Sequence, residues 1–220
     1  MRKILSAIVL SVMAWSWSVS AQGQENSGTV DEQFTAAALQ GDTDLVAKLL
    51  QKGANIEARD SGGSTALIAA AAMDNTDLLK LLLAKGANIE AKDDRGTTAL
   101  GSAAQTKQIE AAKLLLASHA NVEAKGNNGQ TPLMLAAAAG SAEMVTLLLT
   151  NGASPEAKDS HGFTALMTAA GGGQADVVKA LLDKGASVKT KSSDGMTALQ
   201  LAENNGMAEI VKLLRSKGAH

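Results

Sequence analysis

DSGGSTALIAAAAMDNTDLLKLLLAKGANIEAK, residues 60–92, determines the fold because the rest of the chain repeats it at a step of 33 residues. Thr-x-Leu recurs in step, at Thr65, Thr98, Thr131, Thr164 and Thr197. Gly-Ala pairs keep the same step, beginning at Gly53, Gly86, Gly152, Gly185 and Gly218, and His119-Ala120 fills the remaining place. A fixed period of this length is typical of stacked units that cannot bury their apolar faces alone. The sequence therefore predicts one elongated solenoid.

The unit itself predicts a turn followed by two helices and an extended connection. Asp60 and Gly63 are turn formers, and Thr65 stands where a helix N-cap is expected. A short alanine-rich helix should follow and end at a glycine in the left-handed conformation, as at Gly41 and Gly140. The second helix carries leucines at steps of three and four, which predicts a single apolar stripe. The segment after each Gly-Ala pair is expected to form a finger loop that projects from the helices.

The first 21 residues have a different character. Arg2 and Lys3 precede an apolar stretch, and small residues follow it up to Ala21. This order is typical of a secretory signal peptide. The alternative, an uncleaved membrane anchor, is disfavoured because serines interrupt an apolar run that is short for a span of ~20 residues. We expect cleavage after Ala21, a linker over residues 22–30, a bacterial periplasmic or secreted protein, and no stable membrane insertion.

Composition limits the chemistry that the chain can perform. Lys and Arg total 20 against 22 Asp and Glu, so there is no basic excess to neutralise nucleic-acid phosphates. The chain has no cysteine, which excludes disulfides, thiolate nucleophiles and cysteine-ligated metals. His119, His161 and His220 occupy different positions of the repeat and lack metal-ligand spacing. Serine and threonine recur at capping positions, so we expect no enzyme activity, no metal and no cofactor.

The order Asp-x-x-Gly-x-Thr-(Pro/Ala)-Leu, a small-residue helix, and then Leu-Leu-x-x-Gly-Ala, repeated every 33 residues, resembles the ankyrin repeat. The resemblance covers residues 31–220 and implies an all-α solenoid of six helix-turn-helix units. We assign the units to residues 31–59, 60–92, 93–125, 126–158, 159–191 and 192–220. The resemblance also implies that the short helices and finger loops form a concave face that binds other proteins. We expect the protein to be a monomer.

The third unit departs most from the pattern. Lys107 replaces the glycine that ends the first helix, and His119 replaces the glycine of the Gly-Ala pair. A residue other than glycine at positive φ costs roughly 1 kcal/mol, so we expect local softness between these two positions. The family often has histidine after Thr-Pro-Leu, and this chain instead has Ile68, Gly101, Met134, Met167 and Gln200. Stability should therefore depend more on apolar packing than on hydrogen bonds between helix starts.

Two rows of charge follow the finger segments at the same step. The acidic row is Glu57, Glu90, Glu123 and Glu156, and the basic row, two residues later, is Arg59, Lys92, Lys125, Lys158 and Lys191. Because the units stack directly, we expect each acid to face a base on its own or a neighbouring unit. Exposed pairs contribute about 0–1 kcal/mol each, which favours a soluble rim. The alternative is a polar docking edge.

Candidate binding residues are those that vary while the repeated frame stays fixed. We predict a protein-binding surface made of Met73, Arg95, Thr97, Gln105, Asn128, Gln130, Leu135, His161, Phe163, Thr168, Asp194 and Met196. An exposed Phe163 beside His161 would resemble a binding hot spot. The alternative is that Phe163 packs over the neighbouring finger and closes the stack.

The sequence favours an exported, non-enzymatic module that binds another protein through the concave face. An inhibitor or immunity-type protein that masks one exported enzyme is one alternative. A protective envelope factor without a dedicated partner is another. The residues that would carry affinity follow no general code, so the sequence does not identify the partner.

Overall fold

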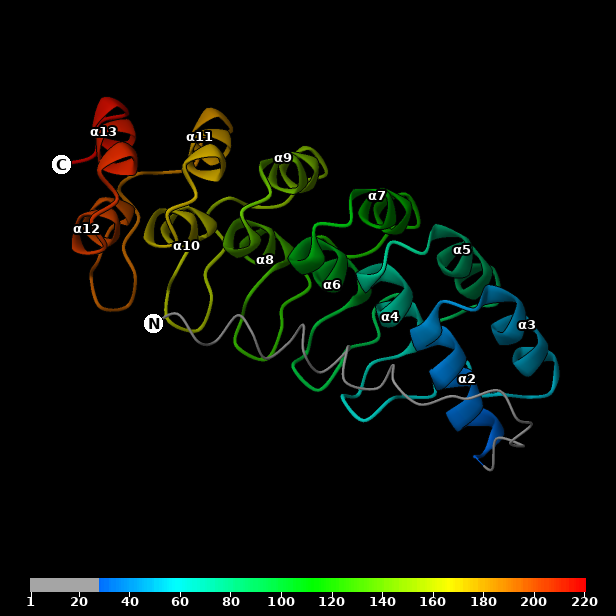
Figure 1. Ribbon diagram of the computed structural model, residues 1–220. Coiled ribbons are helices and arrows are strands. Elements are labelled where there is room, and N and C mark those ends of the chain that lie inside the picture. The colour runs from blue at the N-terminus through cyan, green and yellow to red at the C-terminus, as the bar shows by residue number, and fades with distance from the viewer. Residues whose placement is uncertain (1–27) are drawn as a thin grey trace, which may run out of the picture.

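A computed structural model describes residues 28–220 of the chain. Twelve helices in this range form six antiparallel pairs, which stack side by side in an arc (Figure 1). The pairs are α2 (Val30–Gln40) with α3 (Thr43–Gln51), α4 (Ala66–Ala72) with α5 (Thr76–Ala84), α6 (Ala99–Thr106) with α7 (Ile109–Ala117), α8 (Pro132–Ala139) with α9 (Ala142–Thr150), α10 (Ala165–Gly171) with α11 (Ala175–Asp183), and α12 (Ala198–Asn204) with α13 (Ala208–Ser216). The expected all-α solenoid of six units is confirmed.

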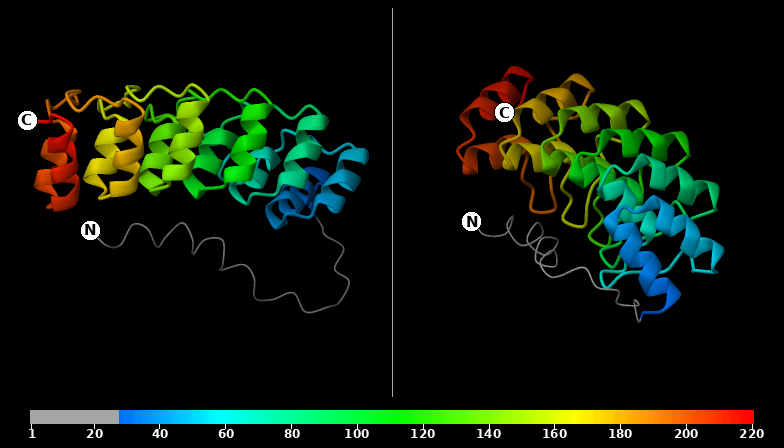
Figure 2. Two further views of the ribbon diagram at one scale, coloured as in Figure 1. Left: turned by 90° about the horizontal axis from the view of Figure 1, so that it is seen from above. Right: turned by 45° about the vertical axis from the view of Figure 1, so that its right-hand side comes forward.

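The even-numbered helices form an inner layer and the odd-numbered helices an outer layer. The finger loops that join the pairs project beside the inner layer, on the hollow side of the arc (Figure 2). We call the surface made by these fingers and the inner helices the concave face. An isolated bridge between Arg59 and Thr65 is the only β-type pairing in residues 28–220. No helix in that part of the chain is long and apolar enough to cross a membrane.

The expected signal peptide and residues 22–27 of the expected linker lie outside the described residues. The last residues of the expected linker take part in the fold. Thr29 is the N-cap of α2 and forms a capping box with Glu32, so the helix already begins at Val30. The reciprocal bonds of a capping box satisfy two backbone amides that a helix start leaves free. The repeat array therefore begins slightly earlier than the sequence predicts.

The core consists of columns of like residues at the repeat step. Phe34 occupies the first place of a buried column that continues as Leu67, Leu100, Leu133, Leu166 and Leu199. Alanines fill a second buried column, with Ala37, Ala70, Ala103, Ala136, Ala169 and Ala202. Outer helices add a third, with Leu49, Leu82, Leu115, Leu148, Leu181 and Leu214. Small residues let neighbouring inner helices approach closely, which is why a chain with 2% aromatic residues can still form a continuous core.

Threonine caps the inner helices as predicted. The side chains of Thr65, Thr98, Thr131, Thr164 and Thr197 each accept a hydrogen bond from the amide three residues later. Gln200 adds a feature that was not predicted, because its Oε1 accepts a hydrogen bond from the Thr197 amide and completes a capping box. The positions expected to lack the Thr-to-His bond hold buried side chains at Ile68, Met134 and Met167.

The expected pairing of acid and base along the charged rows is wrong. Each glutamate accepts a hydrogen bond from a backbone amide 31 residues later, for example Glu90 Oε1 from Asn121 at 2.7 Å. Each lysine from Lys92 to Lys158 donates to a carbonyl 33 residues later, for example Lys125 Nζ to Lys158 at 2.9 Å. Finger backbones have few sheet partners, so their polar groups need side-chain partners. The rows tie consecutive units together through the backbone.

Three residues other than glycine have positive φ in the described part of the chain. Lys107 (φ 64) and His119 (φ 65) were predicted to do so, and Asp74 (φ 58) was not. Asp74 stands where other units have the glycine that ends the inner helix, and its Oδ1 accepts a bond from the Ala111 amide at 2.7 Å. That amide lies in the first turn of α7, whose N-cap Gln108 makes no side-chain capping bond. Asp74 therefore caps a helix of the next unit.

Candidate functional site

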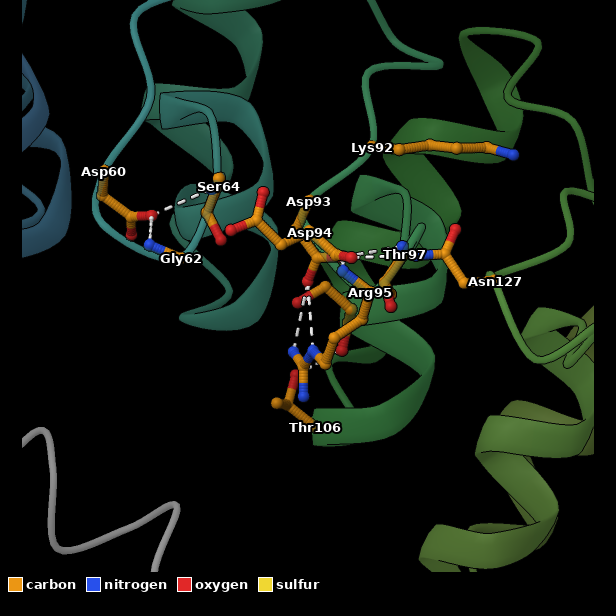
Figure 3. Close-up of polar contacts among 12 residues, drawn as sticks. Asp60, Gly62, Ser64, Lys92, Asp93, Asp94, Arg95, Thr97, Thr106 and Asn127 are labelled. Carbon is orange, nitrogen blue, oxygen red and sulfur yellow. Dashed lines mark hydrogen bonds and ion pairs between the residues drawn. The ribbon is translucent and has the colours of Figure 1, made fainter.

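Aspartate side chains fix the turns at the tips of the fingers. Asp93 Oδ1 accepts hydrogen bonds from the amides of Arg95 (3.0 Å) and Thr97 (2.7 Å). Asp60 makes the same two bonds in the preceding finger, and Figure 3 shows both turns. Asp159 repeats them in a later finger. A carboxylate that bonds its own backbone holds the turn in one conformation, so the residues on its tip point in a fixed direction.

Backbone hydrogen bonds connect each finger tip to the next. They run from amide to carbonyl, with lengths from 2.9 to 3.2 Å, and join Asp94 to Gly62, Asn127 to Arg95, Ser160 to Asn128, and Ser193 to His161. Predicted site residues thus contribute their carbonyls to this row at three fingers. Because the row is ordered before any partner arrives, binding would not have to order these loops.

A small cavity lies on the concave face between the third and fourth units. Its volume is about 90 Å³, and the residues that line it are Arg95, Thr97, Thr98, Gly101, Gln105, Ala124, Gly126, Asn128, Gln130 and Leu135. Half of the twelve predicted site residues meet here: Arg95, Thr97, Gln105, Asn128, Gln130 and Leu135. Sites for small molecules usually measure about 300–1,000 Å³. This cavity, which we call the notch, is large enough for only a small part of a larger partner.

Arg95 lies at the mouth of the notch in a defined position. Its Nε and Nη2 donate to Asp93 Oδ2 at 3.3 and 3.2 Å. The Asp93 side chain is 3% exposed, whereas that of Arg95 is 62% exposed. Figure 3 shows the Arg95 side chain extending toward Thr106 at the end of α6. The buried carboxylate therefore holds an exposed guanidinium across the rim and balances its charge.

Polar side chains from both units also line the notch. Asn128 Nδ2 donates to Gln130 Oε1 at 2.8 Å, and Asn128 Oδ1 accepts from the Gln130 amide at 3.2 Å. Gln105 is exposed on α6. These amide groups offer both donors and acceptors and add no charge.

The other predicted site residues lie outside the notch. Met73 is 42% exposed at the end of α4, and Asp194 and Met196 lie on the last finger. In the fifth unit, His161 is exposed, and the Thr168 hydroxyl donates to the Thr164 carbonyl within α10. Phe163 is half-buried and packs against the hydrophobic core. Its position fits the alternative in which Phe163 helps to close the stack.

Four residues of the notch were not predicted from the sequence, namely Thr98, Gly101, Ala124 and Gly126. Thr98 belongs to the repeated frame and does not vary between units, so it was not among the predicted binding residues. Gly101 was visible in the sequence as the one small residue among larger side chains at its repeat position. Comparing the size of the side chains at each repeat position, in addition to their polarity, would have identified Gly101.

Titratable side chains are dispersed over the described residues. Residues 28–220 contain no cluster of three or more His, Asp or Glu side chains that could hold a metal ion. Lys113 donates to Glu110 at 2.7 Å, which raises the pKa of the Lys113 ammonium, with smaller contributions from the Glu110 and Glu143 charges. Lys113 and Glu110 lie on α7 in the outer layer, away from the notch. The notch itself offers hydrogen-bonding groups and apolar contact.

Comparison with known proteins identifies one matching family. The family described as Ankyrin repeats (3 copies) matches residues 34–126, 87–159 and 133–220, which together span residues 34–220. No curated protein matches the chain in sequence.

Proposed function

The chain belongs to the ankyrin repeat family, and from this premise we propose that it is a non-enzymatic module that binds a partner protein through its concave face. Ankyrin repeats are in general protein–protein interaction modules. The observation that supports this surface is the notch, where six independently predicted residues from two fingers and two inner helices meet. The residues of the repeated frame are occupied in capping, turn formation and core packing, so the variable residues remain for recognition.

A protein fits the concave face better than a metabolite or a nucleic acid. The notch is several times smaller than a usual small-molecule site. The formal net charge of the chain is −2, and the guanidinium at the notch is paired with Asp93, so the notch offers phosphates no unpaired cation. An array of ordered loops with an Arg, amide side chains and a small apolar recess is suited to the surface of another protein.

Replacing Arg95, Gln105 and Asn128 together by alanine tests the proposal. All three side chains are exposed, so the variant should keep its fold. The tagged protein would be used to capture partners from an extract of the source cells, with identification by mass spectrometry. We expect the wild-type protein to retain a stoichiometric partner and the variant to lose it. Unchanged capture by the variant would contradict binding through the concave face.

The outer layer offers a matched control. Asp77 and Lys80 are exposed on α5 and contact each other at 3.4 Å. Replacing both by alanine removes polar groups from the opposite layer and should leave capture unchanged. Inhibition of a captured enzyme would identify the masking role, and absence of any retained protein would favour the protective role.

We also propose that the protein is exported and loses residues 1–21. Trp15 and Trp17 both lie in that segment, and the chain has no tyrosine. A processed chain therefore has almost no absorbance at 280 nm, whereas an unprocessed chain shows the absorbance of two tryptophans. Mass spectrometry of protein from the periplasmic fraction measures the cleavage directly. An intact N-terminus in that fraction would contradict processing.

A further inference from the structure

The notch lies at a gap in one of the repeated columns. The inner helix of each unit after the first has a residue at this position: Ile68, Gly101, Met134, Met167 and Gln200. Ile68, Met134 and Met167 are buried, with 1–4% exposure, so in three units the position holds an aliphatic or thioether side chain against the core. In the third unit the same place holds no side chain, and Gly101 lines the notch.

The backbone gives no reason for glycine at this position. Gly101 lies within α6 and does not have positive φ. Glycine inside a helix is less favourable than alanine by about 0.8–1.0 kcal/mol. What distinguishes Gly101 from the equivalent residues is therefore the absence of a side chain beside Thr97 and Leu135.

The position of the absent side chain adjoins the notch. A Cβ atom at Gly101 would lie 2.9 Å from Thr97 Cγ2, 3.4 Å from Leu135 Cδ1 and 3.7 Å from Thr98 Oγ1. All three neighbours line the notch. A Cβ this close to the Thr97 methyl group would require Thr97 to shift, so glycine at position 101 lets the side chains of Thr97 and Leu135 line the cavity as they do. The amide and guanidinium groups stand at its rim.

We propose that the notch receives one aliphatic side chain, of the size of isoleucine, leucine or methionine, from the partner protein, and that Gly101 is the residue that selects it. This inference rests on the proposed function. The partner's side chain would lie against Gly101, Thr97 and Leu135, in the unit that lacks the side chain that Ile68, Met134 and Met167 supply elsewhere. The amides of Gln105, Asn128 and Gln130 would then bond the partner's backbone on either side of the anchor.

An acidic side chain would fit the notch less well. The Arg95 guanidinium already bonds Asp93 through two nitrogens, and the Asp93 carboxylate is buried beside it. A second carboxylate would therefore meet a cation that is already paired and a like charge close by. An aliphatic group meets methyl groups and displaces water.

The test uses a phage-displayed library of random heptapeptides selected on the full chain. Binding of each enriched peptide is then measured on wild-type protein, on Gly101→Met and on Gly171→Met. The first variant places at the notch a residue that the chain already carries at equivalent positions, and its Cβ requires the Thr97 side chain to shift. The second adds the same bulk to the same layer two units away, where a Cβ would make only ordinary contacts at 3.6 Å or more. Gly101→Ala is the smaller variant to use if Gly101→Met fails to fold.

We expect the peptides to share one Ile, Leu or Met position and to bind Gly101→Met at least about tenfold more weakly than wild type, with no change on Gly171→Met. Replacing the shared residue by alanine should weaken binding to wild type and cause no further loss on Gly101→Met, because both changes remove the same contact.

Two other results would distinguish the proposed role of the notch from the proposed binding through the concave face. Peptides that lose binding on the Arg95, Gln105 and Asn128 triple variant but bind Gly101→Met as tightly as wild type would overturn the notch and leave the concave face intact. A selection whose peptides ignore both variants, or that returns no binder, would overturn the proposed function and the inference together.

Discussion

Asp74 offers a quantitative test of how neighbouring units are joined. The residue has positive φ at a place where Gly41, Gly140, Gly173 and Gly206 stand in other units. Its carboxylate bonds the Ala111 amide at 2.7 Å and so caps α7, which has no side-chain cap of its own. Left-handed backbone costs a residue with a side chain about 1–2 kcal/mol, and Asp lies at the low end because its short polar side chain can bond locally. A hydrogen bond to a charged group contributes about 1.5–3 kcal/mol, which is enough to offset that cost.

Three substitutions separate the bond from the strain. Asp74→Gly removes both, so we expect a net loss of about 1 kcal/mol in the free energy of unfolding. Asp74→Ala removes the bond and keeps the strain, so the loss should reach about 2–3 kcal/mol. Asp74→Asn keeps an acceptor oxygen and a residue that tolerates positive φ, so its loss should stay below about 1 kcal/mol.

Urea denaturation gives the free energies, and amide hydrogen exchange locates the effect. For a domain of this size, 1 kcal/mol corresponds to a shift of about 2–4 °C in Tm. We expect faster exchange at Ala111 in Asp74→Gly and Asp74→Ala, with little change in α11 (Ala175–Asp183). If Asp74→Gly were as stable as wild type, or if the Ala111 amide exchanged at its wild-type rate, the reasoning about the cap would be refuted.

Further predictions concern the positive-φ residues, the glutamate row and the state of assembly. Lys107→Gly and His119→Gly each relieve left-handed strain and should raise the free energy of unfolding by about 1 kcal/mol in urea titrations; a decrease would contradict this. Glu90→Gln keeps the acceptor for the Asn121 amide and should stay within about 0.5 kcal/mol of wild type, while Glu90→Ala should lose about 1 kcal/mol. Equal losses in both variants, removed by high salt, would restore the ion-pair interpretation. Analytical ultracentrifugation should show a monomer, and a concentration-dependent dimer would contradict that expectation.

The fold could be predicted from the sequence because one set of local rules recurs in every unit. Thr65 and its copies cap helices, Asp60 and its copies fix turns, and glycines end helices, so each unit repeats the same information. The positive φ of Lys107 and His119 followed from their places in the repeat. The positive φ of Asp74 was not predicted, because its hydrogen-bond partner, the Ala111 amide, lies in the next unit and no local sequence pattern indicates this contact.

The hydrogen-bond partners of the charged rows could not be predicted from the sequence. Glu90 and Lys92 have opposite charges and adjacent places, which suggested a pair. In the structure, each of them bonds a backbone group of the next unit. An unpaired backbone amide or carbonyl in a finger costs more free energy than an exposed ion pair contributes. Which backbone group lies within reach of a side chain depends on how the units are stacked, and the sequence does not state that.

The candidate site could be predicted in part, because some of its residues vary between units while the repeated frame stays fixed. Arg95, Asn128 and Gln130 were selected because they vary in a fixed frame, and they meet at the notch. Phe163 was selected for its aromatic ring, yet it packs against the core. Gly101 was overlooked as a site residue because a missing side chain becomes meaningful only when its neighbours are known.

Hydrogen–deuterium exchange of the chain with and without its captured partner tests the central claim most directly. Binding through the concave face predicts new protection in residues 93–106 and 126–139, which contain the fingers and inner helices around the notch, and none in α7 (Ile109–Ala117) or α9 (Ala142–Thr150). Protection confined to those outer helices, with the two notch segments unchanged, would contradict it.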